Sequence, residues 1–194
     1  MAFNSISLVT GAAGFMGSHL VEHLVEKGIK VRATSRPRKK TPFFDKLGVE
    51  FIPSDLTKPE TLPPLFEGSV DCVYHLGAIC NFSTPFKKLR PTNVEGVRHT
   101  TGLALKAGIK RFVHVTSTSV YGYYRGTPFV EDSPRNPEDD YGKSKKMGED
   151  IVFERLKEGL PAVIARPSPT PSAPGGVPCL LRHAFHGVGR LLLP

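Results

Sequence analysis

The hydrophobic positions of the chain follow two alternating spacings. Short runs of apolar and β-branched residues alternate with longer stretches in which apolar residues recur every three or four positions. The short runs predict buried strands and the longer stretches predict amphipathic helices. Strands are expected over residues 6–10, 29–34, 49–52, 70–76, 111–116 and 162–165. Helices are expected from Met16 to a Gly28 cap, over 59–66 behind a Thr57 cap, over 91–107 up to Gly108, and over 141–157.

The alternation of strands and helices predicts the fold class. Helical connections between successive strands favour right-handed crossovers and a parallel sheet. Residues 1–167 are therefore expected to form one α/β domain with a doubly wound parallel sheet. Six prolines occur from Pro161 to Pro178, and proline supplies no N–H group to a helix or a sheet. Residues 168–194 are expected to form a proline-rich segment, with one short helix over 180–193.

Length and composition exclude several classes of protein. The chain has 194 residues, of which 39% are hydrophobic and 23% charged, so it is neither a disordered nor a membrane-spanning chain. The N-terminus has no basic region, which argues against a signal peptide. Three cysteines, Cys72, Cys80 and Cys179, cannot all pair and lack metal-ligand spacing. They favour buried thiols in a cytoplasmic protein without a metal site.

The basic excess of the chain is local. Lys and Arg number 26 against 18 Asp and Glu, which gives a net charge of +8. No acidic residue occurs between Glu26 and Asp45, where seven basic residues fall: Lys27, Lys30, Arg32, Arg36, Arg38, Lys39 and Lys40. Such a region can attract nucleic acid or a small phosphorylated ligand, or can simply aid solubility.

A glycine-rich turn separates the first predicted strand from the first helix. It reads Thr10-Gly11-Ala12-Ala13-Gly14-Phe15-Met16-Gly17. Glycines at this spacing let the backbone turn tightly and approach a pyrophosphate, at which the helix then points its N-terminus. A plain turn without a ligand is the alternative. The position between a strand and a helix favours a dinucleotide site.

The end of the second predicted strand bears on the choice of dinucleotide. Enzymes that prefer NAD usually place Asp or Glu there, about 20 residues beyond the glycines. This chain has Thr34-Ser35-Arg36 instead. A guanidinium can bind a 2′-phosphate through two hydrogen bonds, so Arg36 predicts NADP, with NAD as the alternative. An ordinary solvated loop suffices to explain Lys39 and Lys40.

A tyrosine and a lysine lie four residues apart at the start of the last long helix. Tyr141 and Lys145 share one face of that helix. A neighbouring ammonium favours the phenolate, so the pair can exchange a proton with an alcohol or a carbonyl. The spacing alone is common, but its place at the carboxyl edge of the sheet favours a site. Hydroxyl residues also end the fifth predicted strand, at Thr116, Ser117 and Thr118.

This combination resembles the extended short-chain dehydrogenase/reductase superfamily, of the NAD(P)-dependent epimerase/dehydratase type. Residues 31–36 are also similar to the dihydroflavonol-reductase-like branch, which uses NADP. The matching motifs occur in the order of the family over about residues 5–167. They are the glycine turn, Asp55-Leu56, His75-Leu76-Gly77-Ala78, Asn93-Val94-x-Gly96, Ser117 with Val120-Tyr121-Gly122, Tyr141-x-x-x-Lys145 and Arg166-Pro167.

The resemblance implies a role for each matching residue. Tyr141 would be the catalytic acid and base, Lys145 would lower the pKa of Tyr141 and bind the nicotinamide ribose, and Ser117 would hold the substrate oxygen. A register error of one residue would replace Ser117 by Thr116 or Thr118. Asp55 would bind the adenine amino group, or only cap a turn. His75 and Asn93 would be structural, and Tyr121 would pack. The implied cofactor contacts are Gly11, Ala13, Gly14, Phe15, Met16, Gly17, Arg36, Asp55, Leu56, Leu76, Gly77, Ala78, Tyr141 and Lys145.

The implied reaction is hydride transfer between a nicotinamide and a small-molecule carbonyl or alcohol. It would be a net reduction, or the first half of an epimerisation or dehydration. Val120 and Tyr121 stand where dehydratases of the family usually carry acidic residues, which favours a reductase or an epimerase. The family also implies a homodimer through the helices near 91–107 and 141–157. Its members continue into a substrate-binding lobe, so that lobe is expected to be largely absent, in a truncated and poorly soluble chain.

Two other function classes remain open. The chain could be a catalytically incomplete Rossmann module that binds a dinucleotide or RNA through its phosphate-attracting face, or a structural dimer module. The chain contains no tryptophan and shows no RNA-recognition signature. A pure binding module has no need of a complete Ser-Tyr-Lys set. Nucleic acid and membrane are therefore not expected as partners.

Overall fold

The computed structural model describes residues 5–36, 42–123, 126 and 128–168. The expectations for Arg38, Lys39, Lys40 and Cys179 and for a helix over 180–193 lie outside these residues, as does all of the proline-rich segment except Ser168. The described residues form one sheet of six strands. These are β1 (Ile6–Thr10), β2 (Lys30–Thr34), β3 (Glu50–Phe51), β4 (Val70–His75), β5 (Arg111–Val115) and β6 (Ala162–Ala165).

All neighbouring strands are parallel, in the order β3-β2-β1-β4-β5-β6. The predicted doubly wound parallel sheet is confirmed. The chain passes from β3 at one edge to β4, which pairs with β1 in the middle of the sheet, so the direction of strand addition reverses there. Ligands of such folds bind at this point, beyond the carboxyl ends of the strands.

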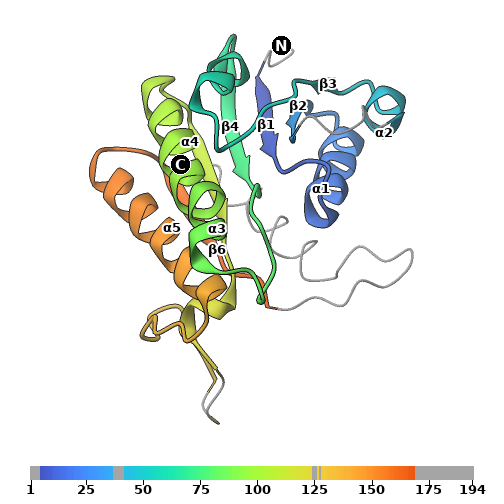
Figure 1. Cartoon of the computed structure of the whole chain (residues 1–194). Coiled ribbons are helices and arrows are strands. Elements are labelled where there is room, and N and C mark those ends of the chain that lie inside the picture. The colour runs from blue at the N-terminus through green and yellow to red at the C-terminus, as the bar shows by residue number, and fades with distance from the viewer. Residues whose placement is uncertain (1–4, 37–41, 124–125, 127, 169–194) are drawn as a thin grey trace.

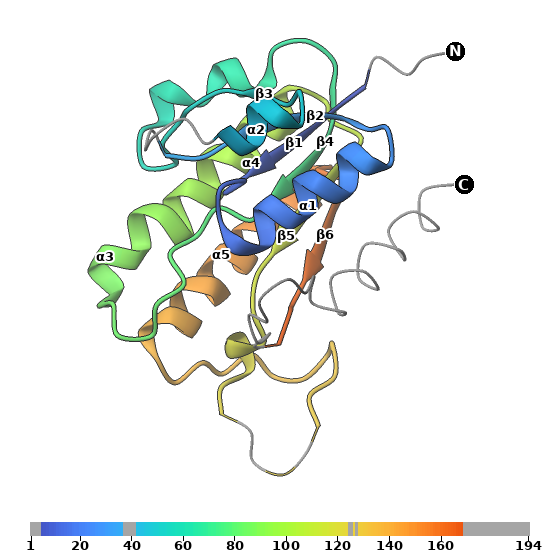
Figure 2. The same cartoon turned by 90° about the vertical axis from the view of Figure 1, so that its right-hand side faces the viewer.

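Helices cover both faces of the sheet (Figures 1 and 2). On one side lie α1 (Phe15–Glu26) and α2 (Pro42–Lys46). On the other lie α3 (Phe86–Arg90), α4 (Gly96–Lys106) and α5 (Asp140–Lys157). No helix in the described part of the chain is long and apolar enough to cross a membrane.

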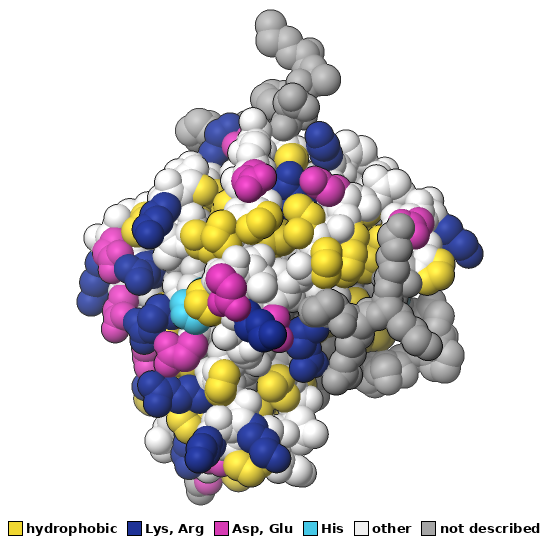
Figure 3. Space-filling view, turned by 45° about the horizontal axis from the view of Figure 1, so that its top comes forward, with side chains coloured by type: hydrophobic (Ala, Val, Ile, Leu, Met, Phe, Trp, Pro, Cys, Tyr) yellow, Lys and Arg dark blue, Asp and Glu magenta, His cyan; other side chains and the backbone are white. Residues whose placement is uncertain are grey.

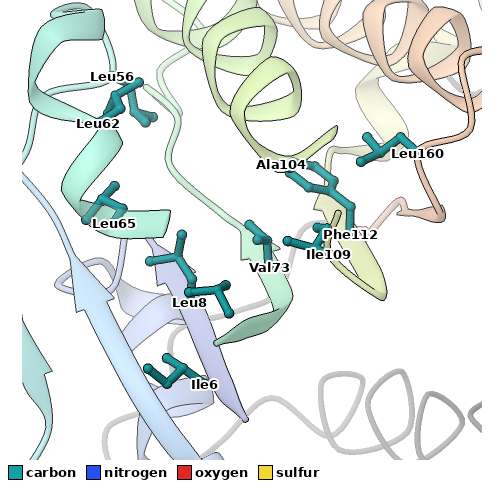
Figure 4. Close-up of a cluster of buried hydrophobic side chains, with 11 residues drawn as sticks. Ile6, Leu8, Leu56, Leu62, Leu65, Val73, Ala104, Ile109, Phe112 and Leu160 are labelled. Atoms are coloured by element: carbon teal, nitrogen blue, oxygen red, sulfur yellow. The ribbon is translucent and has the colours of Figure 1, made fainter. Parts of the chain in front are cut away.

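Alternation along the strands divides the core between the two faces, because successive strand residues point to opposite sides of a sheet. Leu8 and Phe112 belong to a cluster beneath α4, whereas Val9 and Val113 pack beneath α1. Figure 4 shows the first cluster, in which strand residues meet leucines from the connection between β3 and β4. Both layers hold the central strands rigidly, so the strand ends are fixed in position.

Several predicted helices differ in detail from those observed. Residues 59–66 form two short 3₁₀ helices, η1 (Pro59–Thr61) and η2 (Pro63–Phe66), because the prolines remove the N–H groups that an α-helix needs. The residue before η1 is Lys58, so the predicted Thr57 cap is wrong. The predicted helix over 91–107 begins as a π-helical turn, η3 (Pro91–Glu95), and continues as α4. The helices α1 and α4 end before Gly28 and Gly108, as predicted.

Candidate active site

A cleft of about 450 Å³ opens at the carboxyl edge of the sheet. Its walls come from the glycine turn after β1, the segments after β4, β5 and β6, and the first turns of α5. The lining residues are Gly11, Gly14, Phe15, Met16, Gly17, Leu76, Ala78, Cys80, Phe82, Val115, Thr116, Ser117, Ser119, Tyr141, Lys145, Pro167 and Ser168. All three predicted catalytic residues therefore share one cavity with the predicted phosphate-binding turn.

The glycine turn brings α1 unusually close to two strand ends. Gly11 has a positive φ of 67°, and a Cβ atom there would lie 2.8 Å from the backbone of Gly77. A Cβ atom at Gly17 would lie 2.2 Å from the carbonyl oxygen of Gly11. The N-cap residue of α1 is Gly14, so no side chain caps the helix. The positive end of α1 thus borders the cleft without a protein anion, which suits a phosphate group.

Five of the predicted cofactor contacts do not line this cleft: Ala13, Arg36, Asp55, Leu56 and Gly77. Leu56 still lies beside Gly77, because its Cδ1 atom would be 2.6 Å from a Cβ placed there. Asp55 Oδ1 accepts hydrogen bonds from the N–H and the hydroxyl of Thr57, at 2.9 and 2.8 Å. Asp55 thus stabilises a turn, which is the alternative role that the sequence left open.

The charge of Asp55 links it to Arg36. Partial burial by itself would raise the pKa of Asp55, but the two hydrogen bonds from Thr57 and the charges of Arg36 and Lys58 lower it below its ordinary value. Asp55 is therefore ionised at neutral pH, and the exposed Arg36 side chain lies within reach of its charge. The segments after β2 and β3 thus place a guanidinium within electrostatic range of a carboxylate.

Ser117 is the best placed of the three hydroxyl residues after β5. It precedes the 3₁₀ helix η4 (Thr118–Tyr121), accepts a hydrogen bond from the Ser119 N–H at 3.1 Å and donates one to the Ser119 hydroxyl at 3.0 Å. Ser117 also lies within hydrogen-bonding reach of the Tyr141 phenol. The Thr118 N–H donates to the Pro167 carbonyl at 3.1 Å, and Thr118 does not line the cleft.

Thr116 lines the same cavity. It is buried, and its hydroxyl has no hydrogen-bond partner among the described residues. A buried hydroxyl without a partner is uncommon in proteins. The cleft therefore offers a polar atom that a bound molecule can satisfy.

Tyr141 and Lys145 are held by the start of α5. Asp139 caps this helix by accepting a hydrogen bond from the Gly142 N–H at 2.7 Å, which places Tyr141 in the first turn and Lys145 one turn later. Both side chains are buried, with 5% and 4% of their surface exposed. The Lys145 ammonium donates to the Val115 carbonyl at 3.0 Å.

Burial dominates the proton affinity of both groups. It lowers the pKa of Lys145 to about 8, although Cys80 and Glu149 act in the opposite direction. It raises the pKa of Tyr141 above the ordinary value of 10, Cys80 and Asp139 add to this effect, and Ser117 opposes it. The predicted lowering of the Tyr141 pKa by Lys145 is therefore not observed in this structure. Tyr141 carries its proton at neutral pH and can act as an acid.

Cys80 and Phe82 contact Tyr141 in the cleft, although the sequence analysis gave them no role in the site. Cys80, predicted to be a buried thiol, is exposed and lies in hydrogen-bonding contact with Tyr141. Phe82 meets the Tyr141 ring edge-on, with ring centroids 5.0 Å apart. Both follow β4 in a segment without regular structure, where no sequence period marks which side chains face inward. The other described cysteine, Cys72, is half-buried.

The residues expected to be structural make internal contacts. His75 pairs with the Thr10 hydroxyl at 3.1 Å and stacks on the buried His114 ring. The Asn93 side chain exchanges two hydrogen bonds with the backbone of Ile79, at 2.8 and 3.0 Å, and donates a third to the Ser144 hydroxyl at 2.9 Å. Asn93 thereby fixes the segment after β4 against α5.

Comparison with known proteins agrees with this geometry. The chain matches the NAD dependent epimerase/dehydratase family over residues 7–177. It is 31% identical over 198 residues to the uncharacterized protein YbjS of Escherichia coli, across 96% of this chain and 57% of that protein. It is 30% identical over 173 residues to a putative dihydroflavonol 4-reductase of Synechocystis, across 86% and 49% of the two chains.

A solved structure shows the same fold. The crystal structure of a short-chain dehydrogenase/reductase superfamily protein from Agrobacterium tumefaciens with bound NAD has a TM-score of 0.74 and 32% identity. The match covers 83% of this chain and 48% of that chain. The chain thus spans about half the length of the relatives that it matches. It belongs to the NAD dependent epimerase/dehydratase family.

Proposed function

We propose that this chain holds the dinucleotide site and the proton-transfer site of an NAD(P)-dependent oxidoreductase or epimerase that acts on a carbonyl or an alcohol. One observation carries the proposal: Ser117, Tyr141 and Lys145 line the same cleft as the uncapped end of α1. Anion binding and proton transfer are the two properties that dinucleotide-dependent hydride chemistry needs from the protein.

The described residues fit the cofactor. A Cβ atom at Gly11 or Gly17 would collide with neighbouring backbone, so the turn has the close packing typical of a pyrophosphate cradle. Leu76 and Ala78 line the cleft beyond this turn, and the Lys145 ammonium would hold the nicotinamide ribose. When bound, the nicotinamide supplies or accepts the hydride.

The residues of the chain supply the proton. Tyr141 keeps its proton at neutral pH because burial raises its pKa, so it can donate that proton to a substrate carbonyl oxygen. In the opposite direction the phenolate takes the proton from an alcohol. Ser117, within reach of the phenol, would hold the same oxygen where negative charge develops. Lys145 is charged below about pH 8 and would stabilise the phenolate that Tyr141 leaves.

Reduction or epimerisation is favoured over dehydration. Dehydration needs an acid or base in addition to the tyrosine, and no Asp or Glu lines the cleft in the part of the chain that the structure describes. The putative dihydroflavonol 4-reductase among the relatives supports assignment of this chain to the dihydroflavonol-reductase-like branch of the family. We therefore propose a reductase of small carbonyl compounds as the first activity to assay.

The substitution Tyr141→Phe tests the proposed function. It removes the hydroxyl without changing the ring, so dinucleotide affinity is expected to persist while turnover falls by about 10²–10⁴-fold. Binding is followed by NADPH fluorescence and turnover by NADPH oxidation against a panel of aldehydes and ketones. Tyr123→Phe serves as the control, because Tyr123 is exposed and outside the cleft. Turnover that survives Tyr141→Phe, or a wild-type chain that binds no dinucleotide, contradicts the proposal.

We also propose that NADP is preferred over NAD. The end of β2 carries no carboxylate: the Thr34 hydroxyl hydrogen-bonds the Ser54 hydroxyl at 2.6 Å, and the Arg36 side chain is exposed beside it. A guanidinium attracts a 2′-phosphate, which a carboxylate at the end of β2 would repel. The related Agrobacterium protein has NAD bound. The preference of this chain for NADP is therefore tested by measuring its affinity for both dinucleotides.

The substitution Arg36→Ala tests the preference. The loss of one charge-assisted contact is expected to weaken NADP binding by about tenfold and to leave NAD binding unchanged. Lys30→Ala is the matched control, because Lys30 is exposed at the opposite end of the same strand. Calorimetric titration measures the affinities of the wild type and both variants for NADP and for NAD. Wild-type binding of NAD that equals or exceeds that of NADP overturns the preference.

RNA binding is not proposed. On the face shown in Figure 3, Lys and Arg are interspersed with Asp and Glu. Among the described residues, Arg90 and Arg98 both pair with Glu95, at 3.1 and 3.2 Å. RNA binding requires a coherent basic surface, and this mixed face does not provide one.

A further inference from the structure

A fully buried carboxylate lies on α5 behind the cleft. Glu149 has 0% of its surface exposed and follows Lys145 by one helical turn. Its two oxygens accept hydrogen bonds from Arg166, each at 2.9 Å, and one of them also accepts from Arg135 at 3.2 Å. Replacement of such buried ion pairs by apolar side chains is often neutral for stability. Stability alone therefore gives no reason for two arginines around one carboxylate.

Arg166 also reaches the serine turn. Its Nη1 donates to the Tyr121 hydroxyl at 2.8 Å and to the Glu131 carbonyl at 3.1 Å. Tyr121 is the last residue of η4, whose N-cap is Ser117. The residue after Arg166 is Pro167, which accepts the hydrogen bond from the Thr118 N–H. Arg166 and Pro167 thus hold both ends of the turn that begins at Ser117.

The same carboxylate acts on Lys145. The titratable groups that act on this ammonium are His75 from β4, His114 from β5, Cys80 from the segment after β4, and Glu149 from α5, the helix that also carries Tyr141. Burial lowers the pKa of Lys145, and the negative charge of Glu149 raises it. Glu149 therefore opposes the loss of the Lys145 charge.

We propose that Glu149 and Arg166 are positioning residues, which fix the Ser117 turn against the Tyr141–Lys145 face of α5 and support the charge of Lys145. The proposal rests on the proposed function for its catalytic meaning. Its geometric part rests on the ion pair alone, because Glu149 lies on the helix of Tyr141 and Lys145 and Arg166 contacts the turn of Ser117.

A titration of Lys145 tests the proposal without cofactor or substrate. The protein is labelled with ¹³C at lysine Cε, and Lys145→Met identifies the Lys145 signal. In Glu149→Gln, Lys145 is expected to titrate below its wild-type pKa of about 8. Asp150→Asn is the matched control. The neighbouring Asp150 pairs with Arg135 at 2.8 Å and Lys146 at 3.2 Å on the exposed side of α5. In this control the pKa of Lys145 should stay at its wild-type value.

A second variant separates positioning from stability. Glu149→Gln leaves the half-buried charge of Arg166 with fewer partners, whereas Glu149→Gln with Arg166→Met removes both charges together. The double variant is expected to fold and to titrate at Lys145 as Glu149→Gln does. At a pH below both Lys145 pKa values, where the ammonium is charged in either protein, it should lose about 100-fold in kcat with little change in dinucleotide affinity. Arg166→Lys should not rescue kcat, because an ammonium cannot replace the two parallel hydrogen bonds.

The outcomes distinguish this inference from the proposed function. A wild-type Lys145 titration in folded Glu149→Gln, or a wild-type kcat in the double variant, overturns the positioning role even if dinucleotide binds normally. Absence of dinucleotide binding by the wild-type chain overturns the proposed function. A lowered pKa of Lys145 in Glu149→Gln would still support the coupling between the charges of Glu149 and Lys145.

Discussion

The two ends of the proposed dinucleotide site are built differently. The adenosine end would be formed by Arg36, Asp55 and Leu56, which lie in turns after β2 and β3 and do not line the cleft, and its charged groups are exposed or half-buried. The nicotinamide end, formed by Ser117, Tyr141 and Lys145, is almost completely buried. Recognition of a phosphate needs only an accessible charge, whereas proton transfer needs groups whose pKa values burial and neighbours can shift.

The contacts that hold the buried or half-buried charged group of each end differ in range. Asp55 at the adenosine end is held by Thr57, two residues away. At the nicotinamide end, Lys145 donates to Val115 and Asn93 donates to Ser144, so the supporting contacts join segments 30 and 51 residues apart. A substitution at the adenosine end should therefore change affinity locally. A substitution at the nicotinamide end should also change how the elements pack.

The largest effect is expected where the two ends meet, at Gly17. A methyl group there would lie 2.2 Å from the Gly11 carbonyl oxygen, so Gly17→Ala must displace α1. Dinucleotide affinity should fall by more than about 100-fold, and the free energy of unfolding by about 1–3 kcal/mol. Gly102→Ala on α4 is the control: nothing lies within 4 Å of its added methyl group, so it should stabilise the fold by about 0.5–1 kcal/mol. Calorimetric titration measures the dinucleotide affinity of each variant, and thermal unfolding measures its stability. Wild-type affinity in Gly17→Ala would refute the close-packed cradle.

The next largest effect is expected from pH, which should change the binding of the nicotinamide end but not of the adenosine end. Burial lowers the pKa of Lys145 to about 8, so its charge is present below that pH and is lost as the pH rises above it. Affinity for the whole dinucleotide should then fall, by up to about tenfold per pH unit. Affinity for a fragment that carries only the adenosine and its phosphates should stay constant between pH 7 and 9. The comparison uses fluorescence titration of both ligands.

The control for this titration is Lys145→Met. It should weaken dinucleotide binding at neutral pH and abolish the pH dependence. If the fragment and the whole dinucleotide lose affinity in parallel, the difference between the two ends is not electrostatic. If Lys145→Met keeps the same pH dependence, another group is responsible.

The candidate site could be predicted from sequence only where regular elements carry it. Tyr141 and Lys145 are four residues apart on a helix, and Ser117 closely follows the end of β5, so their convergence at one sheet edge follows from the fold. Cys80 lies in an irregular segment, where no period shows which way a side chain points. Glu149 sits among charged residues of α5, and its complete burial depends on Arg166, 17 residues further along the chain.

The fold shows the same division. All six strands were predicted, because each contains or borders a short run of apolar and β-branched residues. The five-residue helices α2 (Pro42–Lys46) and α3 (Phe86–Arg90) were not predicted. A helix of this length completes too few turns to show a 3.6-residue period, and tertiary contacts stabilise it rather than its own sequence. The 3₁₀ turns at 59–66 follow from prolines, whose effect on helix type depends on the packing around them.

The smallest effect is expected from the histidines beneath the nicotinamide end. His75 and His114 are buried and stacked, with ring centroids 5.5 Å apart. Neither nitrogen of His114 has a hydrogen-bond partner in the described chain. Burial and the charge of Lys145 lower both pKa values, that of His75 to about 3, from an ordinary value of 6.5. Because the unfolded chain takes up these protons first, stability falls progressively as the pH drops below 6.5.

The substitution His114→Leu removes one of the two groups and replaces it by an apolar side chain of similar volume. The unfolding free energy at pH 8 should change little, because no described hydrogen bond is lost. At pH 5.5 the variant should be more stable than the wild type by about 1 kcal/mol. The reason is that the unfolded wild type gains free energy when His114 takes up a proton, and the variant has no such group. Urea unfolding at the two pH values measures the difference. If the unfolding free energies of the wild type and the variant differ by the same amount at both pH values, His114 does not cause the loss of stability in acid. Its protonation would then not be coupled to folding or to the charge of Lys145.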